Sequence, residues 1–475
     1  MRSVAVEAVR VALGTSPPND SGHYYHLRMA YCVANDGSRR PQDTKSWLPL
    51  GTSGSTYPPL LHYLLAGMIR ISRKMQAPAL EEIVPRLMLV SLLLMMACFT
   101  ALASSQPALT ALAILSTPVV LGRLVAGGLR GDAMAAAISP LLMFAGANPD
   151  SWWFPTGVPM VLALTGFASA TSAFLFPAML LCVTPTAMNG SIPALAGMAG
   201  ILPVFAICLR ARGRCGGRFT PFIELLWAWR NRKKMCGGLL LDEKTGKVIT
   251  LEERPVSIRG MILASPAVIV ALIWGILSFQ PNPPTVLLAV AVIQSLAARR
   301  YLIYTVAPSA VILGDIPGSA GWYAVAIGVL ICLVTPCRTG EACTSTVDAV
   351  KEAGGDSSSI VVAHWRFGHY ITGYGGMTAL WDTNFKNPSE FKKQATLVKR
   401  MAENPECRNI LKHDSSQIFL VSVPGDGLIP GCGYELVKSG EGYEVWRWAG
   451  PKPTQELATR LLKRITPVKT TYVFN

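Results

Sequence analysis

Charged residues are scarce in this chain, since Asp, Glu, Lys and Arg make up only 15% of its 475 residues. A soluble globular domain carries about 25%, so most of the chain is not expected to be solvated. Hydrophobic residues reach 51% and the mean hydropathy is +0.37, which excludes an intrinsically disordered chain. Eleven cysteines in so long a chain and the lack of an internal repeat also exclude a secreted disulfide scaffold and a collagen.

Ligand sets for zinc and patterns for nucleic acid are missing as well. Cys215 and Cys236 each precede a Gly-Gly pair, but two thiols with no His or further Cys nearby make no zinc site. No RNP-like, helix-turn-helix or finger pattern accompanies the net charge of +15, so we expect no nucleic-acid partner. Met1 to Gly14 contain no apolar stretch long enough for a secretory signal.

Basic residues are concentrated in one segment, between residues 210 and 234. Membrane proteins place their excess Lys and Arg in cytoplasmic loops, so this run predicts a cytoplasmic segment. Its members are Arg210, Arg212, Arg214, Arg218, Arg230, Arg232, Lys233 and Lys234, against the single Glu224.

Three consecutive segments are predicted. Residues 1–85 form an external or lumenal loop, in which the apolar stretch 58–71 is a short interfacial helix because a span needs about 20 apolar residues. Residues 86–337 form a multi-span membrane domain, and residues 338–475 a soluble domain with strand-like runs at 360–362 and 418–421 and a helix at 390–403. The predicted spans cover 86–103, 107–126, 132–148, 156–184, 190–209, 258–278, 283–298, 301–316 and 320–336.

Four carboxylates lie at the polar ends of apolar segments: Asp20, Asp132, Glu252 and Glu253. Carboxylates at membrane edges often mark only the boundary with water. Three of them on one face would instead form a site for a hard cation, because Mg²⁺ and Mn²⁺ prefer carboxylate oxygens. The pattern alone leaves both interpretations open.

Seven stretches resemble, in order, the motifs of the catalytic subunit of oligosaccharyltransferase, a GT-C membrane glycosyltransferase. The first looks like its first external loop, the third like the segment that ends in an Asp-x-Asp motif, and the last like its Trp-Trp-Asp-Tyr-Gly signature. The stretches are Asp20 to Arg28, Thr56 to Tyr63, Arg123 to Asp132, Asp150 to Pro155, Thr250 to Glu253, Arg300 to Val306, and His364 to Asp382. The resemblance implies a polytopic α-helical membrane protein of GT-C fold with a C-terminal mixed α/β soluble domain.

The resemblance also implies an activity, the transfer of an oligosaccharide from a lipid-pyrophosphate carrier to Asn in Asn-x-Ser/Thr sequons. Asp20 and Glu253 would be catalytic and, with Asp132, would bind Mn²⁺ or Mg²⁺. The implied partners are lipid-linked oligosaccharide, an acceptor polypeptide, membrane lipid and accessory subunits. The chain would lie in the endoplasmic reticulum membrane of a eukaryote or in the cell membrane of a prokaryote.

Further residues receive roles from the same resemblance. Arg300 and His369 would bind the lipid pyrophosphate, for which the charged fork of an arginine is suited. His364, Trp365 and Arg366 would bind the acceptor sequon, with Trp365 against its Ser or Thr.

Several positions depart from the family pattern. Arg130 stands where the motif has its first Asp, and His364, Arg366 and His369 stand where the signature has Trp, Asp and Tyr. An arginine cannot accept the hydrogen bond that an Asp would take from a hydroxyl. The chain also begins where the family would have completed its first membrane helix, and the interval before Trp152 is one helix short.

Two alternatives therefore stay open. One is a catalytically inactive or truncated paralogue that keeps only the scaffold. The other is a transporter or channel whose intramembrane charges line a path, although the apolar segments lack the broken-helix pairs of such a path.

The predicted topology contains one conflict. The span count puts Asp20 and Asp132 on one side of the membrane, and it puts Glu253 on the same side as the C-terminal domain. If the basic run 210–234 is cytoplasmic, however, Glu253 lies on the opposite side of the membrane from Asp20 and Asp132. Either a span is missing relative to the family, or the basic run does not set the orientation.

Overall fold

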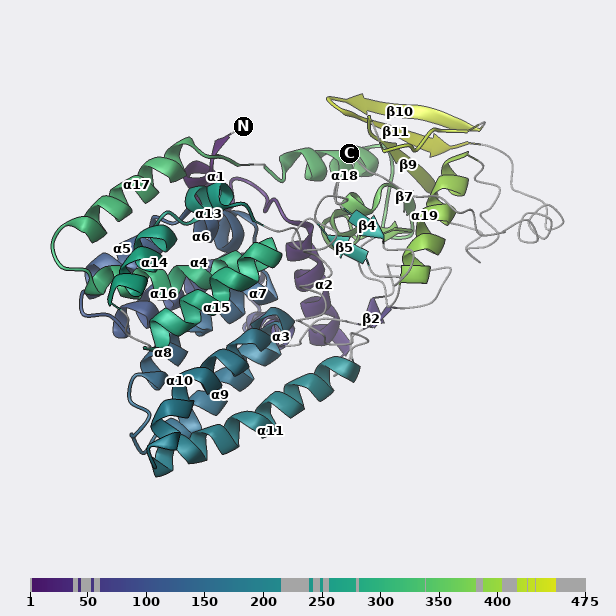
Figure 1. Cartoon of the computed structure of the whole chain (residues 1–475). Coiled ribbons are helices and arrows are strands. Elements are labelled where there is room, and N and C mark those ends of the chain that lie inside the picture. Colours follow the sequence, from purple (N-terminus) through teal and green to yellow (C-terminus); the bar gives the residue numbers. More distant parts are fainter. Residues whose placement is uncertain are drawn as a thin grey trace. The chain divides into compact units, whose positions relative to one another are not determined.

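The computed structural model describes residues 2–36, 42–43, 53–54, 60–214, 239–241, 248–250, 256–278, 282–337, 339–381, 388–403, 417–424, 426–431 and 433–449. They belong to two compact units, each of which is described by itself (Figure 1). A helical unit comprises residues 1–19, 57–234 and 251–339, and a sheet unit comprises residues 20–56, 235–250 and 340–475. The first 85 residues thus contribute to both units.

Prolines begin many helices of the helical unit, because a first-turn residue has no intrahelical partner for its N–H in any case. Pro78, Pro107, Pro118, Pro140 and Pro283 each occupy such a position. The helices are α1 (Val4–Leu13), α3 (Leu60–Lys74), α4 (Pro78–Leu102), α5 (Pro107–Leu115), α6 (Pro118–Val120), η2 (Leu121–Ala126), α7 (Gly131–Ile138), α8 (Pro140–Gly146), α9 (Phe154–Ala168), η3 (Ala170–Phe174), α10 (Leu175–Met188), α11 (Ile192–Arg214), α13 (Ile258–Ala264), α14 (Ala267–Ser278), α15 (Pro283–Ala297), η5 (Arg299–Thr305), α16 (Val306–Asp315) and α17 (Ala320–Val334). A short pair, β1 (Arg2–Ser3) and β6 (Pro336–Cys337), joins the two ends of the unit.

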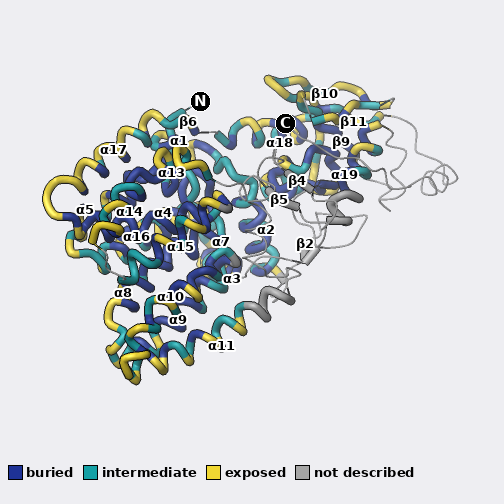
Figure 2. Tube along the Cα trace, in the orientation of Figure 1, coloured by how far each residue is buried: buried dark blue, intermediate teal, exposed yellow. Residues whose placement is uncertain are grey.

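Among the described residues, two helices are long and apolar enough to cross a membrane: Pro78–Leu102 and Thr171–Met188. Two bent pairs pass the same test when each is taken together: Pro107–Leu115 with Pro118–Ala126, at 55°, and Ile258–Ala264 with Ala267–Ser278, at 109°. Apolar residues also cover the outside of shorter helices, as on α17, where Tyr323, Leu330 and Val334 are 61–75% exposed (Figure 2). Such surfaces suit a lipid environment.

Three of the predicted spans are interrupted, each by a break between two helices. The span 156–184 is divided at Ser169, whose backbone is extended and whose Oγ accepts the N–H of Thr171 to start a new helix. The span 258–278 breaks at Ser265, and the span 107–126 breaks before Pro118, which has no N–H to continue the helix. Only one or two polar residues and a proline interrupt the apolar runs here, so the overall composition did not separate the paired helices.

The sheet unit has a five-stranded sheet in the order β10-β11-β9-β7-β8. Strands β7 (Ile360–Val362), β8 (Thr378–Ala379) and β9 (Ile418–Ser422) are parallel, while β10 (Tyr434–Gly440) and β11 (Tyr443–Trp448) form an antiparallel hairpin beside β9. The mixed α/β domain predicted at the C-terminus is therefore present, with strands at both predicted runs. The unit also contains α2 (Ser21–Asp36), α18 (Glu341–Glu352), η6 (Trp365–Phe367), η7 (Tyr370–Tyr374), α19 (Pro388–Glu403), and the short pairs β2 (Gln42–Asp43) with β3 (Ser53–Gly54) and β4 (Leu239–Leu241) with β5 (Val248–Thr250).

Alternating side chains of the central strands supply a core on each face of this sheet. Ile360 and Val362 pack with the apolar residues of α19. Val361 and Phe419 pack on the other face with residues of α18, η7 and α2, including Tyr24. A segment near the beginning of the chain thus completes the core of a domain built from its end.

Candidate functional site

Asp132, in the first turn of α7, is held by two arginines. Nη2 of Arg123 donates to Oδ2 at 2.6 Å, and Nε of Arg130 donates to Oδ1 at 3.0 Å. The backbone N–H of Ala133 donates to Oδ1 as well, at 3.0 Å. The side chain of Asp132 is 8% exposed, against 16% and 13% for Arg123 and Arg130. The carboxylate is thus the most deeply buried member of this Arg–Asp–Arg cluster.

Glycines bring the members of the cluster together. Arg123 lies on η2, one π-helical turn that ends shortly before Gly128, whose φ of +82° is the left-handed conformation that a glycine adopts without strain. A Cβ on Gly131 would lie 2.4 Å from a backbone carbonyl oxygen at the end of α9. Glycine at these positions lets the chain turn back after η2 and lets α7 begin directly against α9.

The elements that pack against α7 carry hydroxyl groups and a further arginine. Helix α7 packs against η3 and η5. Between these elements, Oη of Tyr304 lies 2.8 Å from Oγ1 of Thr171, which is 2.9 Å from Oγ of Ser169. Arg300 lies on η5. The structure therefore brings Asp132 and Arg300, two of the predicted site residues, onto elements that are in contact.

Asp132 does not fit the predicted role of a metal ligand. Mg²⁺ binds oxygen ligands at about 2.1 Å, whereas both oxygens of Asp132 already accept hydrogen bonds from guanidinium groups, whose charge repels a second cation. The described part of the chain contains no group of three or more His, Cys, Asp or Glu side chains suited to a metal ion. Binding of Mn²⁺ or Mg²⁺ stays a prediction, because Glu253 lies outside the described residues and Asp20 belongs to the other unit.

In the sheet unit, Asp20 precedes α2 and caps its first turn. Oδ1 of Asp20 accepts the backbone N–H of Gly22 at 2.7 Å, as an N-cap residue does. Burial raises the pKa of the Tyr370 phenol, and the nearby Cys343 and Asp20 raise this pKa further. Asp20 is thus within electrostatic range of the signature segment at the other end of the sequence.

Helix α2 packs directly on η7, which follows the signature. The ring centroids of Tyr24 and Tyr370 are 4.9 Å apart, and those of Tyr25 and His369 are 5.1 Å apart. Nη1 of Arg28 donates to a carbonyl oxygen of η7 at 3.0 Å, across 344 positions of sequence. The first and the seventh of the predicted motifs therefore lie together in one unit.

The three residues predicted to bind the acceptor follow β7 in a single turn. Nδ1 of His364 accepts the N–H of Arg366 at 3.4 Å, and its ring lies 5.2 Å from that of Trp381. Burial, with the charge of Arg366, lowers the pKa of His364 to about 3. The ring is therefore neutral, with its proton on Nε2. Trp365 is half-buried against the core on the α19 side, and Arg366 is exposed with its guanidinium over Phe367 at 4.8 Å.

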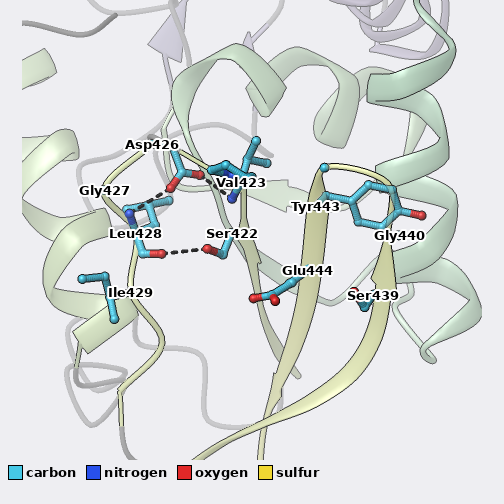
Figure 3. A pocket seen from close by; sticks show the side chains of 12 residues that line it. Ser422, Val423, Asp426, Gly427, Leu428, Ile429, Ser439, Gly440, Tyr443 and Glu444 are labelled. Carbon is cyan, nitrogen blue, oxygen red and sulfur yellow. Dashed lines mark hydrogen bonds between the residues drawn. The ribbon is translucent and has the colours of Figure 1, made fainter.

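A cavity of about 580 Å³, which the sequence did not predict, lies beyond the carboxyl end of β9 (Figure 3). Strands β7 and β9 are parallel, so this end of β9 shares an edge of the sheet with the turn that holds Arg366. Oδ2 and Oδ1 of Asp426 accept the N–H groups of Val423 and Leu428, both at 2.9 Å. Burial raises the pKa of Asp426, and the charge of Arg366 opposes this rise. The lining includes Ser422, Ser439, Tyr443 and Glu444.

Arg123 is the other contributor that the sequence did not assign to the site. It lies nine positions before Asp132, a separation that no regular helix or strand converts into a contact. In the sequence it was marked only as the first residue of the third resembling stretch, which is rich in glycine.

No model of a protein family matches the sequence, and neither does any curated protein. Solved structures are similar. The Archaeoglobus fulgidus oligosaccharyltransferase in the apo form superposes with a TM-score of 0.53 at 12% identity, over 95% of this chain and 74% of that one. ArnT from Cupriavidus metallidurans, bound to undecaprenyl phosphate, superposes with a TM-score of 0.56 at 11% identity, over 94% of this chain and 98% of that one. The chain has the fold of the GT-C membrane glycosyltransferases.

The GT-C fold and the apolar helices together support a membrane location. A third similar structure is the archaeal oligosaccharyltransferase AglB from Archaeoglobus fulgidus, in complex with an inhibitory peptide and a dolichol-phosphate. It has a TM-score of 0.50 and 13% identity, over 88% of this chain and 69% of that one. At 11–13% identity the likeness concerns the fold.

Proposed function

We propose that this GT-C chain transfers a glycan from a lipid-pyrophosphate carrier to the side-chain nitrogen of Asn in Asn-x-Ser/Thr sequons. The observation that supports this most directly is the packing of α2, which begins after Asp20, on the segment that contains His369. Both stretches resemble oligosaccharyltransferase motifs, and Arg28 in the first donates to the carbonyl oxygen of Thr372 in the second across 344 positions of sequence.

The proposed reaction breaks one bond and forms another. The bond between the anomeric carbon and the carrier's phosphate oxygen breaks, and its electron pair goes to that oxygen. The amide nitrogen of Asn forms a bond to the anomeric carbon and loses one proton, which the departing phosphate takes up. Because the amide lone pair is delocalised, a carboxylate that accepts a hydrogen bond from the amide N–H would help to localise it. Asp20 and Glu253 are proposed for this role.

The acceptor would bind at the turn after β7. Trp365 offers an apolar surface and an indole N–H, neutral His364 offers its Nε2–H, and Arg366 offers guanidinium donors. All three are hydrogen-bond donors, so the side chain two residues after the acceptor Asn would bind through its oxygen as an acceptor of hydrogen bonds.

The carrier would bind at the helical unit. Its Arg–Asp–Arg cluster, together with Arg300 on η5, supplies positive charge to a leaving phosphate. Both A. fulgidus AglB with dolichol-phosphate and C. metallidurans ArnT with undecaprenyl phosphate have been solved with a polyprenyl phosphate bound, which makes such a lipid the first candidate to test here. His369, which contacts Tyr25 of α2, is proposed to bind the pyrophosphate as well.

The test is glycosylation of an Asn-x-Thr peptide by the purified full chain with lipid-linked oligosaccharide. Product is expected with the Thr peptide and none with a Gln-x-Thr peptide. Asp20→Ala should abolish product, whereas Asp20→Asn keeps the cap on α2 but removes the charge, and so separates catalysis from folding. Product from Asp20→Ala at the wild-type rate would remove Asp20 from the mechanism.

A scaffold without catalysis is the second candidate, and Arg130 and Arg366 favour it. Each places a cation where the resembling motif has a carboxylate. Protein that is folded and binds carrier, but yields no peptide product under any metal condition, would establish this second function instead.

A further inference from the structure

The cavity beyond the carboxyl end of β9 has an acidic lining in a strongly basic protein. Among the described residues that line it, the two that are charged at neutral pH are Asp426 and Glu444. They come from different elements, Asp426 from the loop after β9 and Glu444 from β11 (Figure 3). The chain as a whole carries a net charge of +15. Negative charge is thus concentrated at one concave place on a protein whose net charge repels cations.

The loop after β9 holds the Asp426 carboxylate in a fixed position. Its two oxygens accept the backbone N–H groups of Val423 and Leu428, both at 2.9 Å. Oγ of Ser422 donates to the carbonyl oxygen of Leu428 at 2.9 Å and closes the same loop. An ionised carboxylate offers about four acceptor sites, so hydrogen bonds from a ligand can be added to these two.

Apolar side chains form part of the wall beside the carboxylates. They are Val423, Leu428 and the exposed Ile429. Lys and Arg lay their methylene stems along apolar surface while the charged head reaches polar groups, and both heads form charge-assisted hydrogen bonds with carboxylates. The volume of about 580 Å³ falls within the range of ligand sites, about 300–1,000 Å³. A neutral glycan would leave the two negative charges uncompensated, whereas a basic side chain of a polypeptide matches both parts of the lining.

The cavity adjoins the turn at which the acceptor sequon is proposed to bind. Leu428, which lines the cavity, and Trp365, in the turn after β7, pack in one apolar cluster. Burial raises the pKa of Asp426, and the charge of Arg366 is among the effects that oppose this rise, so these two side chains are within electrostatic range. A polypeptide bound at the turn therefore reaches the cavity within a few residues of its sequon.

We propose that this cavity is a subsite that binds a Lys or Arg side chain of the acceptor polypeptide, a few residues from the sequon. The carboxylates of Asp426 and Glu444 accept hydrogen bonds from the cationic head, and the apolar wall covers the stem. The identity of the ligand as the acceptor rests on the proposed function. The subsite sets a preference among acceptors and takes no part in the glycosyl transfer.

The experiment measures binding of fluorescent peptides to the purified full chain in detergent by fluorescence anisotropy. The peptides contain Gln-x-Thr in place of Asn-x-Thr, so that no glycan can be transferred to them. A single Arg is placed in turn at each position before and after Gln-x-Thr, with Ala elsewhere, so that all peptides have the same net charge. Arg at one position, or at two neighbouring ones, should bind about tenfold more tightly than Arg elsewhere, as expected for a charged hydrogen bond. Equal affinity for Arg at every position would overturn the proposal, since a general attraction does not depend on position.

Variants identify the groups responsible. Glu444→Gln removes a charge from an exposed side chain with little change of shape, and should reduce the tenfold preference to about threefold or less. Asp426→Asn, which keeps one acceptor oxygen for the loop, should do the same. Glu435→Gln removes an exposed carboxylate from β10 of the same hairpin, outside the lining of the cavity, and should bind as wild type does. An unchanged preference in Glu444→Gln would refute the subsite even if Asp426→Asn does not fold.

The subsite and the proposed function fail in different ways. A preference for Arg at one position that depends on Glu444, without product from any Asn-x-Thr peptide, supports binding of a basic side chain in the cavity and removes the proposed function. Product formed at equal rates from Asn-x-Thr peptides with Arg or Ala at every flanking position supports the proposed function and overturns the subsite. Displacement of the Arg peptide by a neutral oligosaccharide from wild type and Glu444→Gln alike would assign the cavity to a glycan, and this too would overturn the subsite.

Discussion

Acidification should destabilise the sheet unit through two buried histidines, His23 and His364. Burial lowers the pKa of His23 to about 4, and burial with the charge of Arg366 lowers that of His364 to about 3. In the unfolded chain both titrate near 6.5. Below that pH the unfolded state binds protons that the folded state does not, so stability that is present above pH 6.5 is lost as the pH falls.

The size of the effect follows from linkage. Between the pKa of a histidine in the unfolded chain and its lower pKa in the folded chain, each pH unit of acidification reduces the free energy of unfolding by about 1.4 kcal/mol. At pH 5, which is about 1.5 units below 6.5, each histidine should reduce the free energy of unfolding by about 2 kcal/mol relative to pH 7, and together they should reduce it by about 4 kcal/mol.

The assay is hydrogen exchange of the β7 segment in the full chain, measured by mass spectrometry at pH 7 and pH 5 and corrected for the intrinsic rates. His364→Gln should lose about 2 kcal/mol of the pH dependence, since it removes one of the two titrations. Val362→Ala, a fully buried and non-titrating neighbour on β7, is the control and should lower stability equally at both pH values. A pH dependence in His364→Gln as steep as in wild type would refute the reasoning.

Three further results are expected. Gly373→Ala should destabilise the sheet unit by about 1–3 kcal/mol, because a Cβ there would lie 2.5 Å from the carbonyl oxygen of Tyr24, and unchanged exchange of α2 would contradict this. Asp132→Asn should lower the stability of the helical unit by about 3–5 kcal/mol, because it removes one partner of a buried ion pair. The measurement is the drop in melting temperature in detergent. The control is Arg73→Gln, which removes the exposed ion pair with Glu81 and should cost only about 0–1 kcal/mol. Arg366 only donates hydrogen bonds, so wild type should accept an Asn-x-Asp peptide better than Arg366→Asp does. The ratio of the glycosylation rate for Asn-x-Asp to that for Asn-x-Thr should be about tenfold higher in wild type than in Arg366→Asp. The same ratio in both proteins would exclude Arg366 from acceptor binding.

Much of the fold could be predicted from the sequence because apolar composition and periodicity are local properties. The apolar runs gave most of the helices, and the runs at 360–362 and 418–421 gave two parallel strands of the mixed domain. Breaks inside apolar runs escaped prediction, since the division at Ser169 depends on one extended residue rather than on composition. The membership of residues 20–56 in the sheet unit escaped it too, because that grouping is set by packing between distant segments.

The sequence by itself determined the residue types of the site and their departures from the resembling motifs, including Arg130, His364 and Arg366. Only the tertiary structure decided which of those residues are in contact with one another. The π-helical turn at Arg123 and the glycine conformations after it bring two guanidiniums to Asp132, and the parallel pairing of β7 with β9 brings Arg366 toward the cavity beside Asp426. Such contacts depend on backbone turns and sheet order, which set distances between residues that sequence spacing does not encode.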